Sequence, residues 1–171
     1  MDALPSVTVG FRQNMLVTLY LAFFVALIAT VWFAMPYSVP YAARLMLAIA
    51  AMVVVVGSVP TIHFPDFRVV ILQADGSDAS QDAQARLAML WGFGWRFLVT
   101  LPITSIVFGF GGAAAVMLYK DNHVFALQPW LYCIAYTVTT FIAAVIGLYL
   151  PCWWWLRMYG KEYRIGLVSA A

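Results

Sequence analysis

Four long stretches without acidic or basic side chains constrain this chain more than any other feature of its sequence. Apart from two histidines, His63 and His123, no ionisable Asp, Glu, Lys, Arg or His occurs in the windows 13–43, 45–65, 97–119 and 122–156. Each window exceeds the roughly 20 residues that a helix needs to cross a hydrocarbon layer about 30 Å thick. Because lipid offers no partner for an open backbone, such segments must be helical.

The expected fold class is therefore an all-α membrane protein, a four-transmembrane-helix bundle with an inner-leaflet amphipathic helix and short cytoplasmic strand-like segments. The chain is expected to form a single membrane domain over residues 1–171, with a cytoplasmic loop over 63–95. The expected spans are 14–35, 42–62, 96–119 and 129–156.

Composition agrees with a lipid solvent. Hydrophobic residues make up 65% of the chain and charged residues 9%, against about 25% charged residues in soluble domains. The formal net charge of +2 is too small to indicate a nucleic-acid partner. On one helix Cys133 and Cys152 would lie about 28 Å apart, too far to form a disulfide.

The distribution of Lys and Arg predicts the orientation. Seven lie on one side of the expected spans and two on the other, and short cytoplasmic segments are the ones enriched in these residues. Both termini and the 63–95 loop are therefore expected in the cytoplasm. The expected location is the inner membrane, with a multi-pass topology. The inner set is Arg12, Arg68, Arg86, Arg96, Arg157, Lys161 and Arg164, and the outer set is Arg44 and Lys120.

Aromatic residues gather at both ends of the expected spans, as interfacial belts do. Packing between helices is the alternative role for one or two of the tryptophans. The outer belt would contain Trp32, Tyr37, Tyr41, Tyr119 and Trp130, and the inner belt Trp91, Trp95, Trp153, Trp154 and Trp155.

The inner loop carries structure of its own. The segment FRVVIL has the composition of a strand, and Asp78 with Gln81 resembles a capping box at a helix start. Ala83, Leu87, Leu90 and Trp91 then follow helical spacing. This pattern predicts an amphipathic helix on the inner leaflet that runs into the third span. The alternative is that the third span extends one or two turns into water.

A faint internal repeat follows each even-numbered span. Residues 66–72 read DFRVVIL and residues 162–168 read EYRIGLV. Two-span units that begin and end on one side would form a parallel repeat. Both copies are expected to form short strands, paired with each other or with a partner chain. The expected cytoplasmic partner contacts are Phe67, Arg68, Tyr163 and Arg164, although an Arg beside an aromatic residue also commonly anchors the end of a span.

No pattern in the sequence predicts catalysis or a cofactor. The two histidines would lie on opposite membrane faces, so they could not ligate one haem together, and HExxH, GxSxG and phosphate-loop motifs are absent. The expectation is no enzyme, no catalytic residues, no metal and no cofactor. A small transporter or homo-oligomeric channel is the alternative function, with Thr100, Thr104 and Ser105 around Pro102 as its polar candidates.

Small residues recur at every fourth position in three of the spans. Such stripes let helix backbones approach closely, and a bundle needs only two or three seams, so one stripe could contact another subunit. The leading expectation is a non-catalytic structural subunit of an inner-membrane assembly, such as a secretion or conjugation apparatus or an electron-transfer complex. Its partners would be the lipid bilayer and other membrane subunits or copies of itself. The expected helix-packing or partner interface comprises Ala22, Ala26, Thr30, Ala34, Ser105, Gly109, Ala113, Ala135, Thr139, Ala143 and Gly147.

Overall fold

The computed structural model describes residues 9–35, 38–121, 129–157 and 162–169. Its main elements are four long helices and two strands, with a short 3-10 helix between the second long helix and the first strand. In chain order they are α1 (Phe11–Ala34), α2 (Tyr41–Ser58), η1 (Val59–Thr61), β1 (Phe67–Gln73), α3 (Ala83–Asp121), α5 (Pro129–Trp155) and β2 (Tyr163–Ser169).

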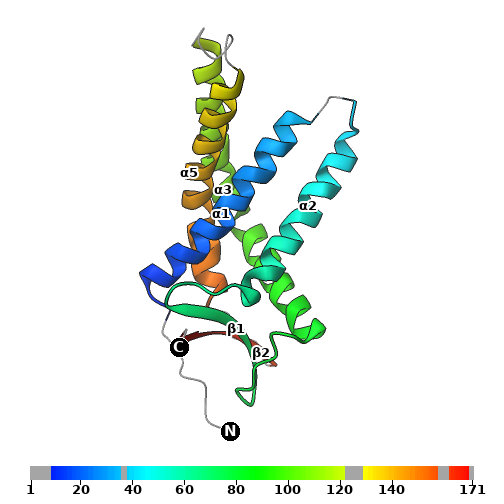
Figure 1. Cartoon of the computed structure of the whole chain (residues 1–171), viewed down its shortest axis with the longest axis vertical. Helices are drawn as coiled ribbons and strands as arrows, with labels where there is room; N and C mark the ends of the chain where they lie inside the picture. The colour runs from blue at the N-terminus through cyan, green and yellow to red at the C-terminus, as the bar shows by residue number, and fades with distance from the viewer. Residues whose placement is uncertain (1–8, 36–37, 122–128, 158–161, 170–171) are drawn as a thin grey trace.

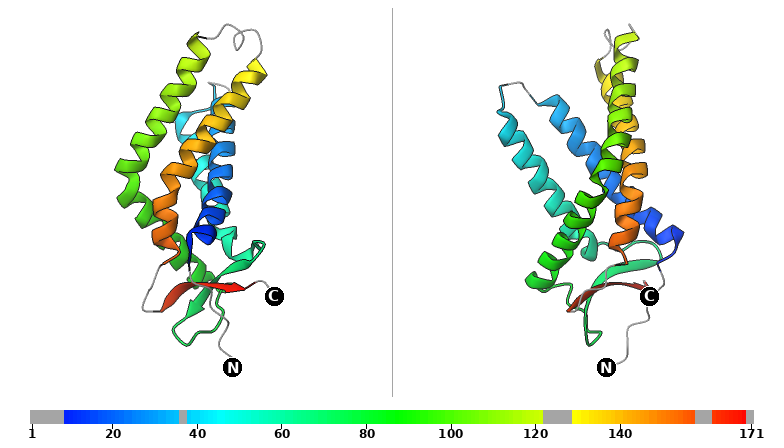
Figure 2. Two further views of the ribbon diagram at one scale, coloured as in Figure 1. Left: turned by 90° about the vertical axis from the view of Figure 1, so that its left-hand side faces the viewer. Right: turned by 180° about the vertical axis from the view of Figure 1, so that it is seen from behind.

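The helices form two hairpins, and both strands lie at the same end of them (Figure 1). Helix α5 packs closely against α1 and against α3, whereas α2 makes far fewer contacts with its neighbours. Figure 2 shows the consequence from behind, where α2 diverges from α5 and α3 toward the end remote from the sheet. The start of α1 lies at the same end of the molecule as the two strands.

Three of the helical segments are long and apolar enough to cross a membrane, namely Phe11–Trp32, Tyr41–Thr61 and Cys133–Trp155. They correspond to the first, second and fourth expected spans, so the prediction of a membrane protein with transmembrane helices is confirmed. The expected third span, 96–119, lies within α3, a helix of 39 residues. Its crossing of the membrane stays a prediction.

Helix α3 changes direction along its length (Figure 2). Pro102 lies inside this helix, and a proline removes one backbone hydrogen bond and bends a helix. At about 1.5 Å per residue α3 is roughly 58 Å long, more than a bilayer core requires. The first turns of α3 continue without a break into the expected third span, and Leu87 and Trp91 are exposed in them. An interfacial segment that runs into a span would have this form.

The start of α3 differs from the expected capping box. The carboxylate of Asp78 accepts a hydrogen bond from the Ser80 backbone N–H at 2.9 Å, which closes a local turn. Asp82 caps the helix instead, because its carboxylate accepts a bond from the backbone N–H of Gln84 at 3.1 Å. The helix therefore begins at Ala83, since Asp78 is committed to the turn before it.

The two strand-like segments pair with each other, as one of the two expectations had it. Strands β1 and β2 are antiparallel, with Phe67 opposite Ser169 and Gln73 opposite Tyr163. At the centre Val70 faces Gly166, and these two residues are equivalent in the repeat. A Cβ added to Gly166 would lie 2.6 Å from Cδ1 of Leu72, so any larger residue here would force that side chain to move.

The core lies at the sheet end of the helices. One face of the sheet, including Phe67, Val69 and Ile71, joins a buried cluster with side chains of all four helices. Trp155 is fully buried there, and its ring packs edge-on against Phe93 with 5.2 Å between the ring centroids. Its indole N–H donates to the Met89 carbonyl oxygen at 3.3 Å. The sheet therefore closes one end of the helices and fixes how they meet.

Candidate functional site: an apolar cavity between the helices

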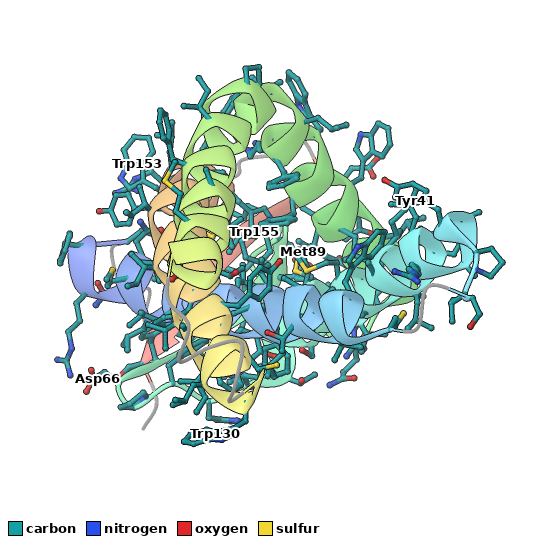
Figure 3. All side chains as sticks on the ribbon, turned by 90° about the horizontal axis from the view of Figure 1, so that it is seen from above. Tyr41, Asp66, Met89, Trp130, Trp153 and Trp155 are labelled. Carbon is teal, nitrogen blue, oxygen red and sulfur yellow. The ribbon has the colours of Figure 1, made fainter. Side chains whose placement is uncertain are left out.

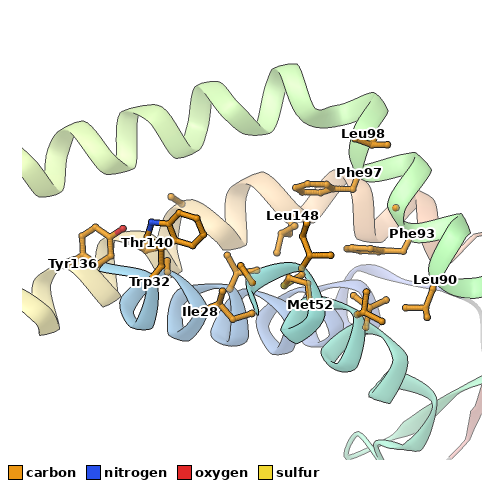
Figure 4. Close-up of a pocket in the computed structure, with 18 residues that line it drawn as sticks. Ile28, Trp32, Met52, Leu90, Phe93, Phe97, Leu98, Tyr136, Thr140 and Leu148 are labelled. Atoms are coloured by element: carbon orange, nitrogen blue, oxygen red, sulfur yellow. The ribbon is translucent and has the colours of Figure 1, made fainter. Parts of the chain in front are cut away.

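An apolar cavity of about 730 Å³ opens between the four long helices. It exists because α2 stands away from the packed group formed by α1, α3 and α5. Figure 4 shows its lining from the end near Tyr136 to the end near Leu90. The lining residues are Val25, Ile28, Ala29, Trp32, Ala48, Ile49, Met52, Val53, Val56, Leu90, Phe93, Gly94, Phe97, Leu98, Tyr136, Thr140, Ala143 and Leu148.

The helical repeat explains why these positions meet. On α3 the lining residues are spaced three and four apart, which places them on one face of the helix; they are Leu90, Phe93, Gly94, Phe97 and Leu98. A Cβ added to Gly94 would meet nothing within 4 Å. This part of the wall therefore has room for a larger side chain or for a ligand.

The polar lining residues gather at one end of the cavity. Trp32, Tyr136 and Thr140 lie together there (Figure 4). Trp32 is in the last turns of α1 and Tyr136 is near the start of α5, so this end is the one remote from the sheet. Outside the cavity the Tyr41 ring packs edge-on against Trp32 at 5.4 Å. The arrangement can hold a long apolar molecule with its polar end beside these aromatic residues.

The small-residue stripe of α1 is used within the molecule. Ala22 and Ala26 are buried, and the Thr30 hydroxyl lies 2.7 Å from the Thr137 hydroxyl of α5. Thr30 also donates to the Ala26 carbonyl oxygen at 2.8 Å. The side chain of Ala34, the last member of this stripe, lies outside the described part of the chain.

The α5 stripe is buried at its sheet end only. Ala143 and Gly147 are buried, whereas Ala135 and Thr139 are half-buried. In α3, Ala113 is exposed, and the side chain of Ser105 and the surroundings of Gly109 lie outside the described part of the chain. Helices α1 and α5 pack closely against each other, and the α5 residue that Thr30 contacts is Thr137, next to the stripe and not in it.

Two buried polar side chains at the sheet end of α1 were not among the predicted site residues. Asn14 and Thr18 are fully buried, and the Asn14 amide donates to the Tyr149 carbonyl oxygen at 3.4 Å. Nearby, Arg157 donates to the Val9 carbonyl oxygen at 2.6 Å. In the sequence, Asn14 is an uncharged amide within the apolar window 13–43. A search for ionisable groups alone does not find it.

The four expected partner contacts on the strands have different surroundings. Phe67 is fully buried and stacks on Phe64 at 4.8 Å, so it belongs to the core and not to a contact surface. Arg68 lies 3.3 Å from the Asp78 carboxylate, and Arg164 is exposed.

Tyr163 lies beside the cap of α3. Its hydroxyl donates to the Asp82 carboxylate at 3.2 Å. Partial loss of water contact, that hydrogen bond, and the negative charges of Asp82 and Glu162 raise the pKa of the Tyr163 phenol above its ordinary value. The phenol therefore stays protonated and acts as a hydrogen-bond donor.

The tryptophans divide between the core and the surface. Figure 3 shows Trp155 and Met89 between the helices, and Trp130 and Trp153 at the periphery. Trp155 is fully buried, so for this residue the alternative role of packing is correct. The guanidinium of Arg157 lies 4.2 Å from the centroid of the Trp153 ring, an arrangement that suits a membrane interface.

Helix α2 exposes a second regular face. Five residues of α2 recur along one face of the helix, at alternating spacings of four and three positions. Four of them are exposed, and the fifth, Gly57, is half-buried. This face points away from the cavity, because the α2 cavity residues lie on the opposite side of the helix. We call it the outer α2 seam, and it consists of Ala43, Leu47, Ala50, Val54 and Gly57.

Within the described residues no three His, Cys, Asp or Glu side chains form a group that could hold a metal ion. Comparison with models of protein families, with curated proteins and with solved structures finds no match for this chain. The fold and the cavity define the class of protein, a helical membrane protein with a two-stranded sheet at one end of its helices.

Proposed function

We propose that the protein is a non-catalytic structural subunit of a multi-protein inner-membrane assembly, of the kind found in secretion or conjugation machines. The observation that carries the proposal is the outer α2 seam. Helix α2 is the least buried of the candidate spans, with 17% of its apolar window buried inside the molecule. A helix held so loosely by its own chain has most of its surface available to another subunit.

The spacing of the seam supports a helix as its partner. Alternating steps of four and three keep one face directed at a neighbouring helix that crosses at about 20°. Ala43, Ala50 and Gly57 alternate with Leu47 and Val54 along it. Small residues allow close backbone approach in lipid, where dispersion and packing drive association instead of exclusion of water.

The proposed orientation places the sheet and both termini in the cytoplasm. It follows from the seven Lys and Arg residues on the sheet side of the expected spans, against two on the other. The described part of the chain supports this grouping, because Arg12, Arg68 and Arg164 belong to elements at the sheet end (Figure 1). In this orientation the exposed Arg164 faces the cytoplasm, and we propose it as a contact of a cytoplasmic partner together with Arg68 and Tyr163, which also bond to Asp78 and Asp82.

The test replaces Ala50 with leucine in the full chain. The added side chain separates the seam from a partner, so the protein extracted in mild detergent is expected to lose its co-purifying subunits or its own oligomer, measured by light scattering after gel filtration. Ala42→Leu is the matched control, because Ala42 is also exposed on α2 but lies outside the seam.

Two results count against the proposal. If the unaltered protein runs as a lone monomer, it is not an assembly subunit. If Ala50→Leu and Ala42→Leu leave the same complex intact, the seam is not the interface. Mass spectrometry of the wild-type complex separates a heteromeric partner from a second copy of this chain.

A further inference from the structure

The cavity between the helices has walls made mainly of large apolar side chains, including Met52, Phe93, Phe97 and Leu148. Its lining on α1, α2 and α5 belongs to the three segments that are able to cross a membrane, so hydrocarbon surrounds its opening. We propose that the cavity is a lipid site that holds one acyl chain of a phospholipid from the leaflet remote from the sheet.

The volume of the cavity suits an acyl chain. An apolar cavity of about 150 Å³ binds benzene, and this cavity, at about 730 Å³, is nearly five times larger. The cavity is therefore much larger than a single ring needs.

The walls also favour a lipid over a helix. Interfaces between membrane helices are enriched in small residues that let the backbones touch. Here the side chains of Trp32, Met52 and Phe97 project into the space (Figure 4), and they hold a second backbone away. A flexible acyl chain can follow such an uneven apolar surface.

One end of the cavity matches the polar part of a phospholipid. Trp32, Tyr136 and Thr140 supply an indole N–H and two hydroxyls at the end remote from the sheet, where the ester groups of that leaflet lie. The Tyr41 ring contacts Trp32, and Arg44 follows one turn later on α2. The Arg44 guanidinium donates to the Val39 carbonyl oxygen at 3.1 Å and brings a positive charge to this end. Its charge complements the phosphate of the lipid.

The experiment uses the full chain in phosphatidylethanolamine vesicles that contain a phosphatidylglycerol with a diazirine in its acyl chain. After illumination, the labelled peptides are identified by mass spectrometry. In the wild-type protein the label is expected on lining segments of α2 and α3. Gly94→Trp adds an indole to the cavity wall at a position where an added Cβ meets nothing within 4 Å, and labelling of those segments is expected to fall about tenfold.

Gly57→Trp is the matched control, because its added Cβ also meets nothing within 4 Å and it lies on the outer α2 seam. It is expected to disturb assembly and to leave the cavity label unchanged, whereas Gly94→Trp does the reverse. Arg44→Gln is expected to reduce the label about threefold by removing one charge. Ala48→Phe, also on the lining, provides a second filling variant if Gly94→Trp does not give a single gel-filtration peak.

The proposal is overturned if the lining segments carry no label above the lipid-facing surface of α2. It is also overturned if both filling variants keep the wild-type label, or if the diazirine lipid labels the cavity only after a co-purifying polypeptide has been removed. The last result would show that a partner helix is the normal occupant.

Discussion

Replacing Trp155 with phenylalanine tests whether the core at the sheet end holds the helices together. The indole is fully buried and donates to the Met89 carbonyl oxygen at 3.3 Å. The phenyl ring is smaller than the indole and leaves a space of up to about 40 Å³. A cavity of that size costs roughly 1 kcal/mol at about 24 cal/mol per Å³. The lost hydrogen bond costs about 1 kcal/mol more. We therefore expect Trp155→Phe to lower the free energy of unfolding by about 2 kcal/mol.

Thermal unfolding in mild detergent, followed by the fraction that remains monodisperse on gel filtration, measures this loss. At about 2–4 °C per kcal/mol for a chain of this length, the midpoint is expected to fall by roughly 4–8 °C. Trp91→Phe is the control, because Trp91 is 76% exposed and its replacement is expected to shift the midpoint by less than about 2 °C. Equal shifts in the two variants would refute a core centred on Trp155.

Two further substitutions test the packing of α5 and of the sheet. Thr30→Val removes the hydroxyl contact of 2.7 Å with Thr137, and a double-mutant cycle with Thr137→Val is expected to give a coupling of about 0.6 kcal/mol, the average for hydrogen bonds between membrane helices; a coupling near zero contradicts the contact. Gly166→Val forces Leu72 to move, because an added Cβ lies 2.6 Å from it, and is expected to cost about 1–3 kcal/mol in thermal unfolding. Gly94→Ala, with open space around its Cβ, is the control, and the same loss in both variants would contradict the crowding at Gly166.

The sequence was sufficient to predict membrane helices and most of the secondary-structure elements. Long windows without ionisable groups predict membrane helices because the cost of charge in hydrocarbon is local and large. The β-branched and aliphatic residues of 66–72 and 162–168 predicted strands for a similarly local reason. The start of α3 was misplaced, because Asp78 and Asp82 are both good caps and the sequence does not show which carboxylate the turn already uses.

The tertiary structure decided which surfaces meet. In lipid the same apolar side chains suit a neighbouring helix and the bilayer, so hydropathy does not distinguish the two faces of a span. For that reason the sequence assigned Ala22 and Ala26 to a helix-packing or partner interface without deciding between the two, and the structure buries both inside the molecule. The sequence also did not reveal that Trp155 is in the core while Trp153 is 41% exposed, or that α2 diverges and leaves a cavity. Composition determined that the helices are apolar enough to cross a membrane, and only the packing of the helices determined which of their faces are buried and where a cavity is left between them.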